Sequence, residues 1–209
     1  MKKLFIFIIS IIFSSNLFAQ SFIEGEHYIR IPKRIHNVPT IVEFFSFFCT
    51  HCYQLEKQLN LNKKIENILS SKNKIQMCHV NFLNNQFDQM LTHIWQMAIS
   101  IHAEKKILIP IFKYIHENTF ALNKNNIKKI FIKYTNITSK KYNLLWNSYQ
   151  VHQLIFNNQQ LTKKIYLKYI PTFLINGKYI INNESFNNVS HHQFITEYIN
   201  LLKYLIQQK

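Results

Sequence analysis

The chain of 209 residues is short of acidic residues, of arginine and of long apolar segments, and these shortages exclude several classes of protein. Asp and Glu number 10 against 25 Lys and Arg, so the formal net charge is +15. Arginine occurs only as Arg30 and Arg34, and no block of basic residues is long enough for a nucleic-acid-binding arm. We therefore interpret the charge as a lysine-rich solvated surface, and we expect no nucleic-acid partner.

The one long apolar run lies at the N-terminus. Residues 4–13 are apolar except for one serine, they follow Lys2 and Lys3, and a small residue comes later at Ala19. This order is typical of a secretory signal peptide. The run is also shorter than the roughly 20 residues that a membrane-spanning helix needs. We expect residues 1–19 to be a signal peptide that is removed on export; an uncleaved anchor is the alternative.

Cysteine is scarce, with only three residues, and two of them form a Cys-x-x-Cys. Cys49 and Cys52 come directly after an aromatic run, where a strand is expected to give way to a helix. Unpaired N–H groups and the helix dipole would stabilise a thiolate at Cys49 there, and Cys52 is near enough to close a disulfide. A ring this small does little to stabilise a fold. We therefore expect a redox-active disulfide rather than a structural one.

Other uses of a Cys-x-x-Cys lack the further residues that they need. Haem attachment requires a histidine directly after the second cysteine, where Tyr53 stands. A zinc site needs two more ligands, and the neighbouring Cys78 and His79 would point to opposite faces of a strand. We expect no metal site. We interpret Cys78 as an inert buried residue; a regulatory or intermolecular disulfide is the alternative.

Apolar periodicity predicts an α/β fold that a block of helices interrupts. Strands are predicted at 27–31, 40–46, 75–82, 171–175 and 178–181, with a turn at 72–74 and a hairpin turn at Asn176-Gly177. Helices are predicted from Cys49 to about Leu69 and at 87–101, 107–116, 126–134, 139–148, 151–169 and 191–206.

Without the helical block, the order of strands and helices is that of a thioredoxin-like α/β unit. We therefore predict a thioredoxin-like fold with an inserted all-helical domain. The first part of the thioredoxin-like domain would cover residues 20–84, the inserted helical domain 85–168, and the second part 169–209.

Two ionisable residues near the cysteines are candidates for catalysis. His51 lies between them, where its imidazole would favour the Cys49 thiolate and make the disulfide more oxidising; the alternative is an exposed loop histidine. Glu43 interrupts an apolar strand. If it is buried, its pKa should be raised and it can exchange a proton with Cys52; the alternative is an edge position that faces solvent.

Several short stretches, in order along nearly the whole mature chain, carry a family resemblance. They are residues 42–49, 51–54, 79–82, 146–148, 170–171 and 176–179. Together they resemble the DsbA family, periplasmic thiol:disulfide oxidoreductases of the thioredoxin superfamily. The resemblance implies a disulfide-forming enzyme in the periplasm, which donates its Cys49–Cys52 disulfide to reduced, unfolded exported polypeptides through a mixed disulfide.

The resemblance also implies partners and binding residues. A DsbB-type membrane partner would re-oxidise the enzyme and pass electrons to quinone, and no cofactor besides the disulfide is expected. Local sequence favours a trans bond before Pro171, whereas the resemblance implies a cis bond, with the backbone of Ile170 pairing with substrate polypeptide. It also places Phe47 and Phe48 near the groove where partners dock. We expect a monomer.

Two residues depart from the family pattern. Thr50 replaces the proline of the commonest motif, Cys-Pro-His-Cys, so the redox potential can differ from that of other members. Met77 stands where the family often has a lysine paired with the buried acid, and we predict that Glu43 is protonated more often here than in those relatives. The alternatives are an isomerase or reductase on the same fold and a non-redox periplasmic polypeptide-binding protein. Isomerases of the DsbC kind carry a dimerisation domain that this sequence does not predict.

Overall fold

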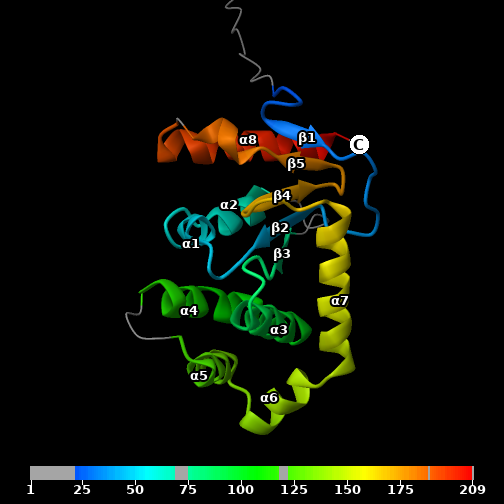
Figure 1. The fold of residues 1–209 in the computed structure, drawn as a ribbon. Coiled ribbons are helices and arrows are strands. Elements are labelled where there is room, and N and C mark those ends of the chain that lie inside the picture. Colours follow the sequence, from blue (N-terminus) through cyan, green and yellow to red (C-terminus); the bar gives the residue numbers. More distant parts are fainter. Residues whose placement is uncertain (1–21, 69–74, 118–121, 188, 209) are drawn as a thin grey trace, which may run out of the picture.

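A five-stranded mixed sheet forms the centre of the computed structural model, which describes residues 22–68, 75–117, 122–187 and 189–208 (Figure 1). The strand order is β1-β5-β4-β2-β3. The strands are β1 (Tyr28–Arg30), β2 (Ile41–Phe45), β3 (Ile75–His79), β4 (Thr172–Ile175) and β5 (Tyr179–Ile181). The predicted signal peptide and the predicted turn at 72–74 lie outside the described residues.

Strand β2 is central, and all five of its residues are buried. It pairs in parallel with β3 and antiparallel with β4, so that Glu43 lies opposite Met77 on one side and Phe173 on the other. This double pairing is the reason why the strand is almost continuously apolar. The Asn176-Gly177 hairpin joins β4 to β5, as predicted, and both turn residues have positive φ.

The described residues also form nine helical segments. They are α1 (Thr50–Lys57), α2 (Leu61–Ile68), α3 (Gln86–Ser100), α4 (Glu104–Glu117), α5 (Lys124–Thr135), α6 (Ser139–Trp146), α7 (Tyr149–Lys164), the 3₁₀-helix η1 (Asn183–Phe186) and α8 (His191–Gln207). Helices α3–α7 lie between β3 and β4 in the sequence, which is the predicted helical insertion. The predicted domain boundaries themselves stay predictions. No helix in the described ranges is both long and apolar enough to cross a membrane.

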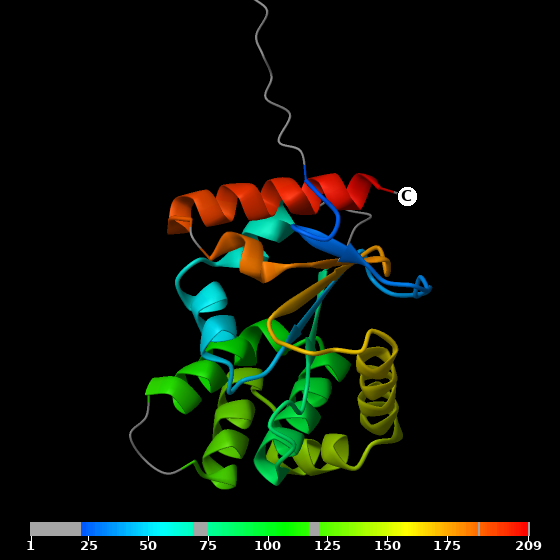
Figure 2. The ribbon, with the colours of Figure 1, turned by 45° about the horizontal axis from the view of Figure 1, so that its top comes forward.

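Different helices cover the two faces of the sheet. Ile41, Phe173 and Ile175 pack against α2 and α8, whereas Val42 and Phe44 pack against residues of α7 and the segment that follows it. In Figure 2, α8 lies along the top of the molecule and most of the insertion forms its lower part. The fold class is therefore the predicted one, a thioredoxin-like sheet with a helical insertion.

Local differences from the prediction occur where helices and strands end. The helical pattern after Cys49 is split into α1 and α2 at Asn60, which has a positive φ of 47°. Helix α7 ends at Lys164 rather than near 169, and Tyr166 beyond it has a positive φ of 49°. The β3 strand ends at His79 rather than Phe82. The short helix η1 carries no apolar repeat and was not predicted.

Aromatic packing connects the end of β2 to the insertion. Phe45 and Phe47 contact Trp95 of α3, with ring centroids 5.0 and 5.8 Å apart, and both contact Phe112 of α4. All four side chains are almost completely buried. Trp95 also donates a hydrogen bond from Nε1 to the carbonyl oxygen of Met77 at 3.0 Å. The insertion therefore shares a core with the strand that leads into the cysteines.

We expect Gly177→Ala to lower the free energy of unfolding by about 3 kcal/mol or more. Gly177 has a φ of +60°, and an added Cβ would overlap the backbone oxygen of Ile35. The matched control is Gly25→Ala, which also has positive φ (+91°) but has nothing within 4 Å of the new Cβ. It should lose only about 1–2 kcal/mol. Equal losses in denaturant unfolding of the two variants would contradict a steric role for Ile35.

Candidate active site

Cys49 and Cys52 form a disulfide at the start of α1, with Cα atoms 5.2 Å apart. Cys49 is the N-cap residue of α1, and the backbone N–H of Cys52 donates to its Sγ at 3.0 Å. The first turn of α1 contains no acidic residue that would cancel the positive end of the helix dipole. When the pair is reduced, the same N–H and dipole stabilise a thiolate at Cys49. Cys52 is fully buried, so Cys49 is the accessible sulfur.

A hydrogen-bonded turn positions Cys49. Its N–H donates to the carbonyl oxygen of Ser46 at 3.0 Å. The Ser46 hydroxyl accepts a hydrogen bond from the N–H of Phe48 and donates one to Oδ1 of the buried Asp88, both at 3.2 Å. Asp88 lies in the first turn of α3 and also accepts from the N–H of Leu83 at 2.9 Å. Burial raises the pKa of Asp88. The start of the insertion therefore braces the turn before the cysteines.

His79 braces the same turn as a neutral imidazole. Its Nε2 accepts from the N–H of Phe47 at 3.1 Å, so Nδ1 carries the proton and donates to Oγ1 of Thr92 at 2.9 Å. Complete burial lowers the pKa of His79 to about 3. Its Nε2 lies 3.6 Å from Oδ1 of Asp88, but a neutral ring forms no ion pair there. Neither His79 nor Asp88 was predicted as a site residue, because each acts through contacts between distant segments.

The Ile170–Pro171 bond is cis, as the resemblance implied. The Sγ of Cys49 lies 3.9 Å from the carbonyl oxygen of Ile170. Asn183 of η1 donates to the carbonyl oxygen of Pro171 at 2.7 Å, and Tyr198 of α8 donates to Asn183 at 3.1 Å. Helix α8 thus supports the loop that faces the disulfide. Ile170 in this loop is half-buried, and its carbonyl oxygen lies beside Cys49.

The two phenylalanines that were predicted to contact partners lie in different surroundings. Phe48 is half-buried and packs edge-on against Phe87, with ring centroids 6.0 Å apart. Phe47 is completely buried in the aromatic cluster with Phe45 and Trp95. Its side chain is out of reach of a docked polypeptide, so the expectation that Phe47 contacts partners is wrong. Side chains alternate in direction along an extended segment, and that of Phe47 points into the core. Phe47 supports the active-site turn from behind.

His51 is exposed on α1 between the two cysteines. It lies in the first turn of the helix, beside the exposed Thr50. This is a place from which an imidazole can interact with a thiolate at Cys49 or with an incoming polypeptide. The effect of His51 on the redox equilibrium stays a prediction.

Glu43 is fully buried on β2, which rules out the alternative of an edge position. The side-chain amide of Asn62 donates to its Oε2 at 2.6 Å. Burial, and secondly the negative charge of Glu56, raise the pKa of Glu43 well above its usual value of 4.5. No lysine lies opposite, since its register partner is Met77. Burial therefore favours the protonated form of Glu43, which is the direction predicted from Met77.

Glu56 is a second buried carboxyl that sequence reasoning missed. It follows Cys52 by four residues, so the two share the buried face of α1. Burial raises the pKa of Glu56 to about 7, while a hydrogen bond from the backbone of Asn62 acts in the opposite direction. The signal for Glu56 in the sequence was its spacing of four residues from Cys52, which places both on one face of the helix. Glu43 and Glu56 are thus two buried carboxyls whose protonated forms are favoured, and Glu56 shares the helix face of Cys52.

Cys78 is free and buried, in agreement with the favoured interpretation. It is hydrogen-bonded to Asn158 of α7, and burial raises the pKa of its thiol. His79 points to the other side of β3, toward Thr92 of α3. Within the described residues, no group of three or more His, Cys, Asp or Glu side chains is placed to hold a metal ion.

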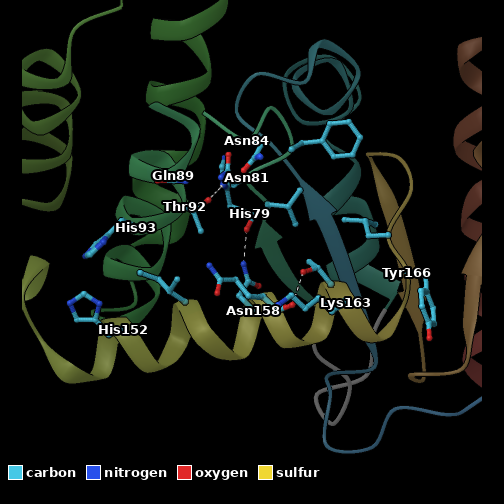
Figure 3. A pocket seen from close by; sticks show the side chains of 16 residues that line it. His79, Asn81, Asn84, Gln89, Thr92, His93, His152, Asn158, Lys163 and Tyr166 are labelled. Carbon is cyan, nitrogen blue, oxygen red and sulfur yellow. Dashed lines mark hydrogen bonds between the residues drawn. The ribbon is translucent and has the colours of Figure 1, made fainter. Parts of the chain in front are cut away.

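A groove of about 1170 Å³ lies between α3 and α7, over the end of β3 (Figure 3). Neither active-site cysteine lines it. Its floor includes His79 and Thr92, the pair that reaches the active-site turn from behind, and Asn158 donates to the carbonyl oxygen of His79 at 2.6 Å. The groove therefore lies beside the residues that support the active-site turn, and not beside the disulfide itself.

Comparisons with known proteins agree with this geometry. A family model described as thioredoxin matches residues 37–192. The chain is 40% identical to the thiol:disulfide interchange protein DsbA of Buchnera aphidicola subsp. Schizaphis graminum, and 28% identical to DsbA of Escherichia coli, with all of both chains covered in each match. The solved structure of DsbA from Klebsiella pneumoniae is 26% identical with a TM-score of 0.82, and the match covers 90% of this chain and 99% of that one.

A structure of Proteus mirabilis DsbA with a non-covalently bound peptide is also similar, at 26% identity and a TM-score of 0.81 over 89% of this chain and 98% of that one. Fold, disulfide and matches together define a thiol:disulfide oxidoreductase of the thioredoxin class. Because the identity to curated relatives extends over the full length, the family is settled as well: the chain belongs to the DsbA family.

The stability of the oxidised protein should fall as pH rises from about 5 to 8. Glu56 has a pKa of about 7 in the folded state against a usual value of 4.5, so the folded state binds its proton more tightly than the unfolded chain does. The contribution of Glu56 to the free energy of unfolding is complete below pH 4.5 and is lost as pH rises through 7. This loss amounts to about 3 kcal/mol. Glu43 acts in the same direction.

Glu56→Gln should remove much of this loss, because glutamine does not ionise. Denaturant unfolding at pH 5 and pH 8 measures the slope, with Glu26→Gln on the exposed surface as the matched control. A Glu56→Gln variant that loses stability as steeply as the wild type would contradict the assignment of Glu56.

We expect Met77→Lys to lower the pKa of Glu43 by about one unit or more, since an ammonium group would then lie opposite the carboxyl in the β2–β3 register. The measurement is a ¹³C NMR titration of the Glu43 carboxyl, with Met77→Leu as the control that adds no charge. A wild-type pKa near the usual value of 4.5 would contradict the preference of Glu43 for its protonated form.

Proposed function

We propose that this oxidoreductase works as a disulfide donor for reduced, unfolded polypeptides in the periplasm. The observation that carries the proposal is the position of Cys49 at the N-terminus of α1, with the N–H of Cys52 donating to its Sγ. Stabilising the Cys49 thiolate stabilises the reduced form of the pair, so the disulfide gives up its oxidised state readily.

The exchange needs two thiols from the substrate. A substrate thiolate attacks Sγ of Cys49 and the Cys49–Cys52 bond breaks, so that the electron pair moves to Sγ of Cys52. A second substrate thiolate attacks the substrate sulfur of this mixed disulfide and releases Cys49 as a thiolate. The substrate gains one disulfide, and the enzyme gains two electrons. The protonated Glu43 and Glu56 can supply the proton that Cys52 takes up.

The surface beside Cys49 fits an extended polypeptide. The carbonyl oxygen of Ile170 lies 3.9 Å from the Cys49 sulfur, and it can accept a hydrogen bond from a substrate backbone. Phe48 offers a half-exposed aromatic ring beside it. The Proteus mirabilis relative, which holds a non-covalently bound peptide, supports peptide binding by this chain. The roles of Ile170, Pro171 and Phe48 in that binding are part of the proposal.

Re-oxidation completes the proposed cycle. A DsbB-type membrane protein would take the two electrons from the reduced pair and pass them to quinone. We propose no cofactor besides the Cys49–Cys52 disulfide. The N-terminal sequence pattern supports export with removal of residues 1–19. We propose that the chain acts as a monomer.

We expect the Cys49–Cys52 pair, equilibrated with glutathione, to behave as a strong oxidant. The known values for DsbA are about −120 mV with a nucleophile pKa of about 3.5, and those for thioredoxin are about −270 mV with a pKa of about 7. A result near the first pair supports disulfide donation despite Thr50. A result near the second pair would mean that the chain works as a reductase or isomerase. Cys78→Ala is the control for the third, buried thiol.

Alkylation of the reduced cysteine pair separates the donor from a non-redox polypeptide-binding protein. Oxidative refolding of a reduced protein substrate should be lost once Cys49 and Cys52 are blocked. Suppression of aggregation of the same substrate should be compared in parallel. If the blocked protein retains its whole effect on the substrate, disulfide donation is not its function.

A further inference from the structure

His116 contacts the chain on both sides of the Cys-x-x-Cys, although it lies in the last turn of α4 in the insertion. Its Nε2 is 2.8 Å from the carbonyl oxygen of Phe47. A carbonyl only accepts, so Nε2 carries the proton and donates. The ring of His116 also stacks on Tyr53, with centroids 4.9 Å apart and planes 12° from parallel. Phe47 precedes Cys49 by two residues, and Tyr53 directly follows Cys52.

The carbonyl group that His116 holds belongs to the middle peptide of the turn that delivers Cys49. The turn runs from Ser46 to Cys49 and is closed by the hydrogen bond between its ends. Reversal of the middle peptide interconverts type I and type II turns. Its carbonyl is held by His116, and its N–H, that of Phe48, is held by the Ser46 hydroxyl at 3.2 Å. The hydrogen bonds to the carbonyl and to the N–H of this peptide therefore both favour the same one of its two orientations.

A second imidazole holds the preceding peptide, because the N–H of Phe47 donates to His79. The end of α4 is further fixed to α1 by Glu117, which accepts from the hydroxyl of Tyr53 and pairs with Lys57. The insertion is thus tied to the turn before the cysteines and to the helix after them, through two adjacent residues of α4.

We propose that His116 is a positioning residue for thiol:disulfide exchange. By fixing the middle peptide of the turn, it keeps Sγ of Cys49 aligned with the N–H of Cys52 and so sustains the thiolate of the reduced enzyme. It acts through the backbone of Phe47. The inference rests on the thiolate role proposed for Cys49, but it does not depend on whether the enzyme works as an oxidant or a reductant.

Two substitutions separate the hydrogen bond from the ring contact. His116→Phe keeps an aromatic ring against Tyr53 but has no donor, whereas His116→Gln places an amide N–H near the position of Nε2 and loses the stacking. A hydrogen bond is worth enough to change an equilibrium constant about two- to tenfold. We expect His116→Phe to make Cys49 a weaker acid by that factor and to shift the glutathione equilibrium of the pair by a similar factor toward the disulfide. His116→Gln should remain close to the wild type.

The readouts are the pH dependence of the thiolate absorbance of Cys49, the glutathione equilibrium constant and the ¹³C shift of the Phe47 carbonyl. Thermal unfolding of the oxidised proteins checks that each variant is folded. His192→Phe and His192→Gln serve as matched controls, since His192 is an exposed histidine in the first turn of α8. All values are ratios to the wild type, so they are informative even if the wild-type potential contradicts disulfide donation.

A folded His116→Phe protein with the wild-type acidity at Cys49 would overturn the proposal. Equal shifts in His116→Phe and His116→Gln would also overturn it, because they would assign the effect to packing on Tyr53 rather than to the hydrogen bond. A change of the Phe47 carbonyl shift in His116→Phe alone, together with weaker acidity at Cys49, supports it.

Discussion

The active site depends on a helix N-terminus that is fixed at the end of a fully buried strand. Strand β2 is held by β3 on one side and β4 on the other, so the point where the chain leaves the sheet is determined by two ladders of hydrogen bonds. The turn that follows ends at Cys49, the N-cap residue of α1. The N–H of Cys52 is therefore already directed at the sulfur of Cys49 before a thiolate forms.

The surroundings of the two cysteines favour opposite protonation states. Cys49 lies at the positive end of a helix whose first turn has no acidic residue, which favours the charged thiolate. Cys52 is fully buried and shares its helix face with Glu56. Burial, and secondly the charge of Glu56, raise the pKa of Glu43 on the neighbouring strand β2. Burial there favours neutral groups. This asymmetry favours the proposed roles, in which Cys49 is the exchanging sulfur and Cys52 takes up a proton.

The helical insertion is part of the catalytic architecture. Its α3 supplies Asp88 and Trp95, and its α4 supplies Phe112 and His116; all four reach the segment that leads into Cys49, directly or through its neighbours. The segment is thus held by hydrogen bonds and aromatic contacts in a buried core, where the low local dielectric strengthens each hydrogen bond. The groove between α3 and α7 shares His79 and Thr92 with this support.

The sequence by itself determined the features that depend on local patterns. The apolar run of β2, the helix that begins at the Cys-x-x-Cys and the Asn-Gly hairpin follow from side-chain periodicity and from backbone preferences within a few residues. The burial of Cys78 follows from its place in a strand, and the cis bond before Pro171 came from the family resemblance.

Only the tertiary structure decided which residues support the disulfide. Asn62 reaches Glu43 across 19 residues of sequence, His79 reaches Phe47 across 32, and His116 reaches it across 69. Periodicity predicted that Phe47 belongs to an aromatic run, but not that its ring is turned into the core. Hydrogen bonds and desolvation act over a few ångströms in space, so their partners are fixed only when distant segments have packed together.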